Sequence, residues 1–281
     1  MTTPSLSYCG KELRAQDHDR FLTCLFAPSH LRDDLFTLYA FNLEVAKTAE
    51  VVSEAMLGRI RLQWWRESLD GIYDGAPRKH AVVEPLASVV SRHRLPRDRF
   101  DVIVDGRELD LEEEPPSDLA ALEAYAASTS GALTQLAAMV LGTEDKTALQ
   151  SANHVGIAWA MIGLLRAVPF HAARKRNFLP ADLSDRHTLR LGDLFELRPS
   201  DALAAVTKDI AQRASWHLNE AGKHGKSYRR ATVAAVLPAI IARRHLKSLE
   251  RAGWNPLDPA VQDNSHGQAW RLFLGYLFVR F

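Results

Sequence analysis

Apolar residues recur every three or four positions along most of this chain, which is the spacing of one face of an α-helix. The pattern is clearest over residues 31–52, 57–64, 119–140 and 203–217. Ser29 and Ser117 precede two of these stretches, and we expect them to cap the first helical turns. A further helix is expected after Ser200. We find no alternating run long enough to indicate a strand. The pattern therefore predicts an all-α fold.

Proline and glycine mark the expected helix breaks. They fall at Pro28, Pro77, Pro96, Pro115, Pro116, Pro169, Pro180, Pro199, Gly253 and Pro256. Pro238 lies inside the apolar run TVAAVLPAIIA, where we expect a kinked helix or a helix break. No repeat, low-complexity tract or linker divides the chain. We predict a single domain over residues 1–281, with an N-terminal extension at 1–16 and a C-terminal tail and helix at 255–281.

Composition excludes several classes of protein. The 281 residues carry 35 basic and 34 acidic side chains, so no strong field favours nucleic acid or an anionic membrane. The first twenty residues lack the features of a secretion or import signal. The longest uncharged run, 124–143, is interrupted by serine, threonine and glutamine, which favours a buried helix over a membrane span. We therefore expect a soluble, cytoplasmic protein.

Two groups of residues are candidates for chemistry. Carboxylates spaced i, i+4 occur at 50/54, 70/74, 101/105, 108/112 and 110/114, and Glu50 with Glu54 is the best candidate, although a solvated helix face is favoured. A basic cluster at 166 and 174–176 lies in GLLRAVPFHAARKRNFLP. The guanidinium of a single arginine binds phosphate through two parallel hydrogen bonds, so this cluster fits a diphosphate or an acidic partner. A solvated helix end fits the spacing equally well. His217 and His224 are seven apart, which is weak as a metal spacing.

Several segments resemble the squalene/phytoene synthase family, in the family's order and from about Asp17 to about Trp254. They are DHDRFLTCLFAPSHLRDDLFTLYAF, LQWWRESLDGIYDG, LEAYAASTSGALTQLAAMVLG, GIAWAMIGLLRAVPFHAARKRNFLPADL and RRATVAAVLPAIIARRHLKSLERAGW. The resemblance implies an isoprenoid-synthase-type helical bundle around a central cavity. In the family's enzymes, aspartates on two facing helices bind Mg²⁺ ions that hold prenyl diphosphates.

The aspartate positions of the family carry other residues here. Counting from "YAF", the first motif falls on Ala46, Lys47 and Glu50, and counting back from "FLP", the second falls on Ala167 and His171. Residues 146–181 contain no aspartate or glutamate, so a shifted register supplies no second site. We expect no bound metal and no cofactor, with Glu50 and Glu54 as the remaining candidate ligands and Mg²⁺ only if the chain is an enzyme after all.

The departures resemble one branch of the family, the branch that contains the mitochondrial assembly factor of respiratory complex I. The shared segments are YAFNLEVAKTAEVVSE with GRIRLQWW, and LLRAVPFHAARKRNFLPADL. This resemblance implies a non-catalytic protein that assists assembly of NADH:ubiquinone oxidoreductase, in the cytoplasm or at the inner face of the membrane. We expect a phosphate or ligand pocket, without catalytic residues, formed by Tyr39, Asn42, Lys47, Glu50, Arg166, His171, Arg174 and Arg176.

Two alternatives stay open. One is a prenyl-diphosphate-using transferase of the same fold with relocated metal ligands, drawn from Glu50, Glu54 and the region 108–114. The other is an isoprenoid- or lipid-binding protein unrelated to respiration. The C-terminal stretch WRLFLGYLFVRF is aromatic and cationic, and a helix packed on the core is favoured over a peripheral contact with a membrane or a partner.

Overall fold

The structure is a computed structural model that describes residues 6–52, 54–223, 232–262, 270, 272–274 and 276. Within these residues every regular element is a helix, which confirms the predicted fold class. The first half contains α1 (Tyr8–Gln16), α2 (His18–Cys24), η1 (Ser29–Leu31), α3 (Arg32–Ala46), α4 (Thr48–Val51), α5 (Ala55–Tyr73), α6 (Val83–His93), α7 (Arg97–Gly106) and η2 (Arg107–Leu111).

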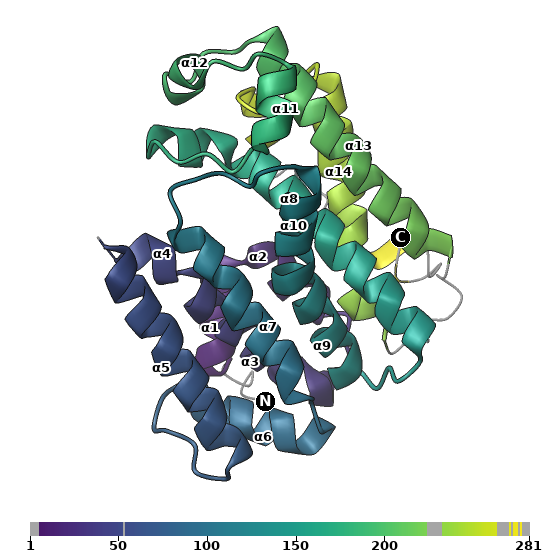
Figure 1. The fold of residues 1–281 in the computed structure, drawn as a ribbon. Coiled ribbons are helices and arrows are strands. Elements are labelled where there is room, and N and C mark those ends of the chain that lie inside the picture. Colours follow the sequence, from purple (N-terminus) through teal and green to yellow (C-terminus); the bar gives the residue numbers. More distant parts are fainter. Residues whose placement is uncertain are drawn as a thin grey trace.

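The second half is built around one long helix. It contains α8 (Leu119–Ala126), the π-helical η3 (Ala127–Gly131), α9 (Ala132–Val140), α10 (Lys146–Ala173), α11 (Ala181–Arg186), α12 (Leu191–Phe195), α13 (Asp201–Lys223), η5 (Val233–Ala235), α14 (Pro238–Arg251) and α15 (Pro259–Gln262). Figure 1 shows α10 in the middle of the bundle, with α13 and α14 on one side, and α5 at the opposite edge. The arrangement explains why α10 contacts α13, α14, η3, α8 and α9.

Close backbone packing holds α10 against the π-helix. A Cβ atom on Gly156 would lie 2.3 Å from the Ser130 carbonyl oxygen and 2.7 Å from the Gly131 Cα, so only glycine fits at this crossing. Asp145 caps α10 by accepting a 2.8 Å hydrogen bond from the Ala148 backbone N–H. The position of α10, which forms one wall of the cavity described below, is fixed by these contacts.

Most predicted helix boundaries are close to the observed ones, with three corrections. Ser29 begins a 3₁₀ turn and makes no capping bond, and α3 follows it only at Arg32. Asp118, one residue after the predicted cap Ser117, caps α8 by accepting from the Ala121 N–H. Pro169 does not end a helix but lies inside α10, which continues to Ala173 although proline donates no backbone hydrogen bond there.

Other expectations about the elements agree with the structure. The Ser200 hydroxyl accepts a hydrogen bond from the Leu203 N–H at the start of α13. Pro238 is the first residue of α14, so the apolar run is broken there. The uncharged run 124–143 forms buried helix. In length and composition α10 is apolar enough to cross a bilayer, but half of its most apolar stretch is buried in the bundle.

The C-terminal stretch is described only in part. Leu272 is buried, and the ring of Tyr276 lies 5.5 Å from that of Phe26, as a helix packed on the core requires. Trp270 and Phe273 are exposed. The rest of the stretch lies outside the described residues, as does His224 of the predicted histidine pair.

Candidate functional site

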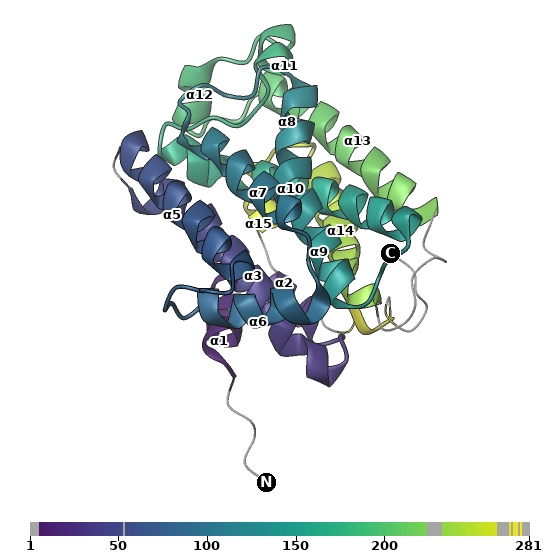
Figure 2. The same ribbon diagram turned by 60° about the horizontal axis from the view of Figure 1, so that its bottom comes forward.

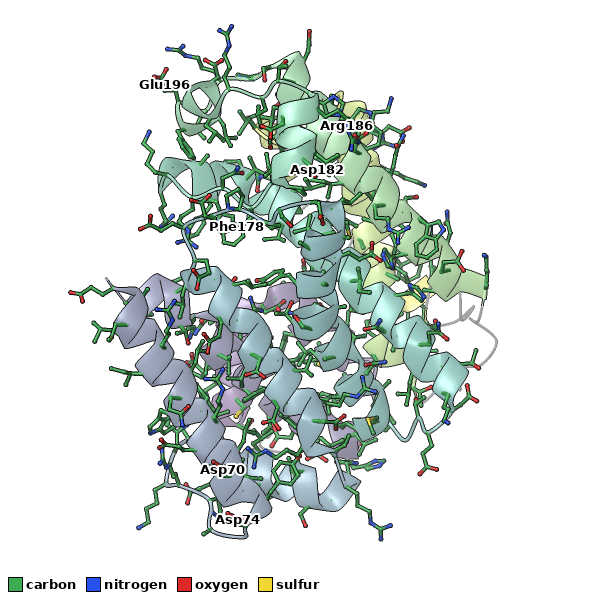
Figure 3. All side chains as sticks on the ribbon, in the orientation of Figure 1. Asp70, Asp74, Phe178, Asp182, Arg186 and Glu196 are labelled. Carbon is green, nitrogen blue, oxygen red and sulfur yellow. The ribbon has the colours of Figure 1, made fainter. Side chains whose placement is uncertain are left out.

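A cavity of about 430 Å³ lies where the end of α3, α4, η2, α8 and the C-terminal part of α10 come together. In Figure 3, Phe178 marks the loop that follows α10 beside this region, and the acidic pair Asp70 and Asp74 lies at the far end of α5. The side chains that line the cavity come from 46, 49, 50, 52, 107, 110, 125, 164, 170, 171, 174, 176 and 178. Four of the eight predicted pocket residues are among them: Glu50, His171, Arg174 and Arg176.

A hydrogen-bonded triad fills one side of the cavity. The Tyr125 hydroxyl donates to Asp110 Oδ1 at 2.7 Å, and Arg107 Nη1 donates to Asp110 Oδ2 at 3.0 Å. Arg107 Nη1 also lies 2.8 Å from the Tyr125 oxygen and donates to it. Asp110 therefore uses both carboxylate oxygens inside the protein, and the charges of Arg107 and Asp110 largely cancel.

The ionisation of the triad follows from its burial and its charges. Burial raises the pKa of the Tyr125 phenol well above its ordinary value, although Arg107 opposes this shift. Burial alone lowers the pKa of Arg107, but Tyr125 and Asp110 outweigh it and the net shift is upward. Tyr125 thus remains a neutral hydrogen-bond donor and Arg107 a fixed cation. The Nε atom of Arg107 is buried and has no hydrogen-bond partner within the protein.

His171 occupies the α10 wall as a neutral ring. Burial lowers the pKa of its imidazole to about 4, Asp110 opposes this, and Arg176 and Arg174 add to it. The ring centroid lies 4.6 Å from that of Phe178 and 5.4 Å from that of Phe170. An uncharged ring between two aromatic rings has the character of a packing residue.

The two arginines that reach the cavity are held differently. Arg176 Nη2 donates to the Asp110 backbone carbonyl at 2.7 Å, which ties the loop after α10 to η2. The Arg174 guanidinium lies 3.6 Å above the centre of the Phe170 ring and donates to the Phe170 carbonyl at 3.4 Å. Neither the carbonyl contacts nor the ring contact neutralises a guanidinium, so both side chains keep a net positive charge for the cavity.

Two other predicted cations point elsewhere. The Lys47 ammonium lies 3.5 Å from Glu44 and 3.9 Å from Glu12, on the side of α1. Arg166 lies 4.0 Å from Asp19 of α2. Arg166 lies within α10, whereas Arg174 follows the last residue of that helix, about two helical turns further along the chain. The basic cluster of the sequence is therefore divided between different surroundings.

Tyr39 and Asn42 lie deeper in the bundle, on α3. Both are buried, at 3% and 5% exposure. The guanidinium of buried Arg20 lies 5.4 Å from the centre of the Tyr39 ring, and its Nη2 donates to the Ser130 hydroxyl at 3.1 Å. The Asn42 side-chain oxygen has no hydrogen-bond partner within the protein. Neither residue lines the cavity described above.

The family's metal positions can now be placed. Ala46 lines the cavity from α3, and Ala167 belongs to α10, as His171 does. Glu54 is exposed at the start of α5. Glu50 and Asp110 are the carboxylates of the cavity lining. Over the described part of the chain, no three histidine, cysteine, aspartate or glutamate side chains lie close enough together to hold a metal ion.

The triad was not predicted from the sequence. Arg107 and Asp110 are three residues apart in the acidic segment DGRELDLEEEPP, and the i, i+4 spacing of carboxylates paired Asp110 only with Glu114. Tyr125 joins them through the packing of α8 beside η2. No local pattern indicates that contact, because it depends on how the two segments meet.

Comparison with known proteins identifies the family. The squalene/phytoene synthase model matches residues 13–271. The chain is 31% identical over 275 residues to NADH dehydrogenase (ubiquinone) complex I, assembly factor 6, from Bos taurus, covering 94% of this chain and 81% of the relative. The human protein of that name matches equally well. A presqualene diphosphate synthase from Sinorhizobium fredii is 27% identical, with 69% of each chain covered.

Solved structures agree on the fold. A dehydrosqualene synthase superposes with a TM-score of 0.84 at 18% identity, over 96% of this chain and 94% of the other. A squalene synthase from Alicyclobacillus acidocaldarius superposes with a TM-score of 0.79 at 18% identity, over 88% of this chain and 94% of the other. The fold is thus of the isoprenoid-synthase type, and the chain belongs to the squalene/phytoene synthase family.

Proposed function

We propose that this protein assists the assembly of respiratory complex I and does not catalyse a prenyl condensation. The observation that carries the proposal is the match to complex I assembly factor 6, at 31% identity over 94% of this chain. That match spans both walls of the cavity. It is also longer and higher in identity than the match to the presqualene diphosphate synthase.

The cavity lining supports the non-catalytic part of the proposal. Mg²⁺ prefers several hard oxygen ligands in octahedral geometry. Glu50 faces the cavity from one wall, Asp110 is committed to Arg107 and Tyr125, and the α10 wall offers the neutral ring of His171. This donor set does not fit a pair of Mg²⁺ ions, and we assign no reaction step to it.

On this proposal the protein acts in the cytoplasm, peripheral to the inner face of the membrane, where subunits or assembly intermediates of NADH:ubiquinone oxidoreductase are its partners. The test is a deletion of the gene in the source organism. We expect NADH:ubiquinone oxidoreductase activity and the intact complex on a native gel to fall several-fold, and the wild-type gene to restore both. Unchanged complex I in the deletion strain would overturn the proposal.

A second candidate is a prenyl-diphosphate-using transferase with relocated ligands. Two observations favour it: the match to the presqualene diphosphate synthase, and the presence of Glu50 and Asp110 in one cavity. It requires Asp110 to leave Arg107 and Tyr125 and to bind a metal. Incubation of the purified protein with farnesyl diphosphate and Mg²⁺ separates the two: we expect no release of diphosphate, and Mg²⁺-dependent release would establish the enzyme.

The third alternative is a lipid-binding protein. Arg174 and Arg176 supply positive charge beside Phe170 and Phe178, which is a suitable lining for an amphiphile with an anionic group. Calorimetric titration with farnesyl diphosphate in the presence of a chelator detects such binding directly. Binding that needs no Mg²⁺ and yields no product would assign the cavity to an isoprenoid ligand.

A further inference from the structure

The outward face of α5 carries an apolar stripe that the bundle does not cover. Met56 is 66% exposed, Ile60 is 61% exposed and Leu57 is 47% exposed, all in the first two turns. Both ribbon views place α5 at the edge of the bundle (Figures 1 and 2). Single exposed apolar side chains are common on proteins, but a contiguous group marks a surface for interaction.

Met56 and Ile60 of this stripe lie in the floor of a shallow groove of about 500 Å³, which we call the α5 groove. Met56, Ile60 and Trp64 recur at i, i+4 and i+8 along its floor, and Arg59, Arg66 and Glu108 lie at its edge. The floor is about 12 Å long at 1.5 Å per residue, a little more than two helical turns. Methionine is flexible and polarisable, which suits a surface that must fit another protein's side chains.

The packing of α5 holds these side chains outward. Leu62, Trp65 and Leu69 on the inner face are fully buried. A Cβ atom on Gly58 would lie 2.4 Å from Leu111 Cδ2, so the first turns of α5 lie directly against η2. Turning Met56 inward would expose the core residues, so the stripe is a fixed feature of the fold.

The charges at the edge of the groove satisfy one another. Arg59 pairs with Glu112 at 2.9 Å, and Arg66 Nη2 lies 2.7 Å from both Asp105 and Glu108. An anionic membrane or a nucleic acid would need cations that are free to bind phosphate. The edge instead presents closed ion pairs around an apolar floor, which is complementary to a partner with an apolar centre and little net charge.

From the length, the side-chain spacing and the neutral edge, we propose that the α5 groove binds an amphipathic helix of a protein partner. The partner helix presents apolar side chains at i, i+3 or i+4, and i+7, and lies along Met56, Ile60 and Trp64. The inference rests on the proposed function only for the partner's identity, an assembly intermediate of complex I.

The test places a photo-crosslinking amino acid at position 60 of the full-length protein in the source organism. Position 216 serves as the control, because Trp216 is 42% exposed and α13 lies on the other side of the bundle from α5 (Figure 1). We expect position 60, and not position 216, to crosslink to a protein at a peptide with the amphipathic spacing. A lipid adduct, a second copy of this chain, a peptide without that spacing, or no adduct above the control would overturn the proposal.

A second measurement distinguishes a loss of partner binding from a loss of folding. The variant Met56→Glu/Ile60→Glu should melt within a few degrees of the wild type, because both side chains are exposed. With the crosslinking amino acid at position 63, which also lines the groove, the variant should form at least tenfold less crosslink than the wild type with the same probe. An undiminished crosslink in a folded variant contradicts the proposal. If deletion leaves complex I unchanged while the helix crosslink remains, the proposed function fails and the groove stands. If complex I falls and no crosslink forms, the groove fails alone.

Discussion

The cavity and the α5 groove lie close together along the chain, since Val52 lines the first and Met56 the second. They differ in which side chains are left without a partner. In the cavity the triad Arg107, Asp110 and Tyr125 uses its polar groups on one another. In the groove the charged groups are also paired, but the apolar side chains are left uncovered. On our proposal, the interacting surface therefore lies on the outside of the bundle.

The comparison also changes how the basic wall of the cavity is understood. Arg176 is bound to the Asp110 carbonyl and Arg174 lies on the Phe170 ring, so both help to hold the cavity together. In a metal-dependent member of the family, such a wall would face carboxylates and metal ions. Here it faces one free carboxylate, Glu50, and a satisfied triad. The predictions below start from this contrast.

The largest effect is expected from breaking the triad. Asp110→Ala leaves the Arg107 guanidinium largely buried with only the Tyr125 hydroxyl as a partner, and we expect it to lower the free energy of unfolding by about 3 kcal/mol. Urea denaturation measures this. Tyr125→Phe is the matched control, because it removes the two hydrogen bonds of the Tyr125 hydroxyl and keeps the ion pair, at about 1–2 kcal/mol. Equal effects would mean that the charge pair contributes nothing.

The next effect concerns pH. The pKa of His171 is about 4 in the folded protein, against an ordinary value of 6.5, so between these pH values the unfolded chain binds the proton more readily. The stability that His171 contributes is present above pH 6.5 and is lost as the pH falls toward 4, by up to about 1.4 kcal/mol per pH unit. His171→Gln should flatten the fall in unfolding free energy measured between these values. An unchanged slope would show that His171 is accessible to water.

The groove predicts a small effect on stability. Met56→Ser and Ile60→Ser change side chains that already face water, so each should alter the free energy of unfolding by less than about 0.5 kcal/mol. Leu62→Ala, on the buried face of the same helix, should cost about 2–5 kcal/mol. Both are read from thermal or urea unfolding. A loss above 2 kcal/mol for Ile60→Ser would mean that the groove is part of the core.

The smallest expected effect is that of Mg²⁺. A metal that binds the native state raises the melting temperature with its concentration. Because the cavity offers Glu50 and a committed Asp110, we expect millimolar Mg²⁺ to leave the melting temperature unchanged, in wild type and in Glu50→Gln alike. A rise that disappears in Glu50→Gln would favour the enzyme over the assembly factor.

The sequence predicted the helices well because their apolar faces repeat within each element. The face of α13 formed by Leu203, Val206, Ile210, Ala214 and His217 is buried as the spacing indicates. Pro169 was misjudged because local propensity favours a break, while α10 is held by its neighbours on several sides. Tertiary packing outweighed the local signal there.

The site was less predictable because it depends on which way each side chain points. The four basic residues of the sequence cluster lie in three places: Arg174 and Arg176 at the cavity, Lys175 over the Phe195 ring, and Arg166 beside Asp19. Lys47 occupies a position of the first metal motif, but its ammonium group lies beside the Glu44 carboxylate. The triad joins η2 to α8 across a turn and a loop, and no residue spacing in the sequence predicts such a contact.

The most direct test of the central claim compares the two regions in one deletion strain. Complementation with Glu50→Gln removes the one free carboxylate of the cavity, and complementation with Met56→Glu/Ile60→Glu disrupts the groove. If the protein is a non-catalytic assembly factor that works through α5, the first variant restores complex I on a native gel and the second does not. Restoration by the groove variant together with failure of Glu50→Gln would contradict the account and return the function to the cavity.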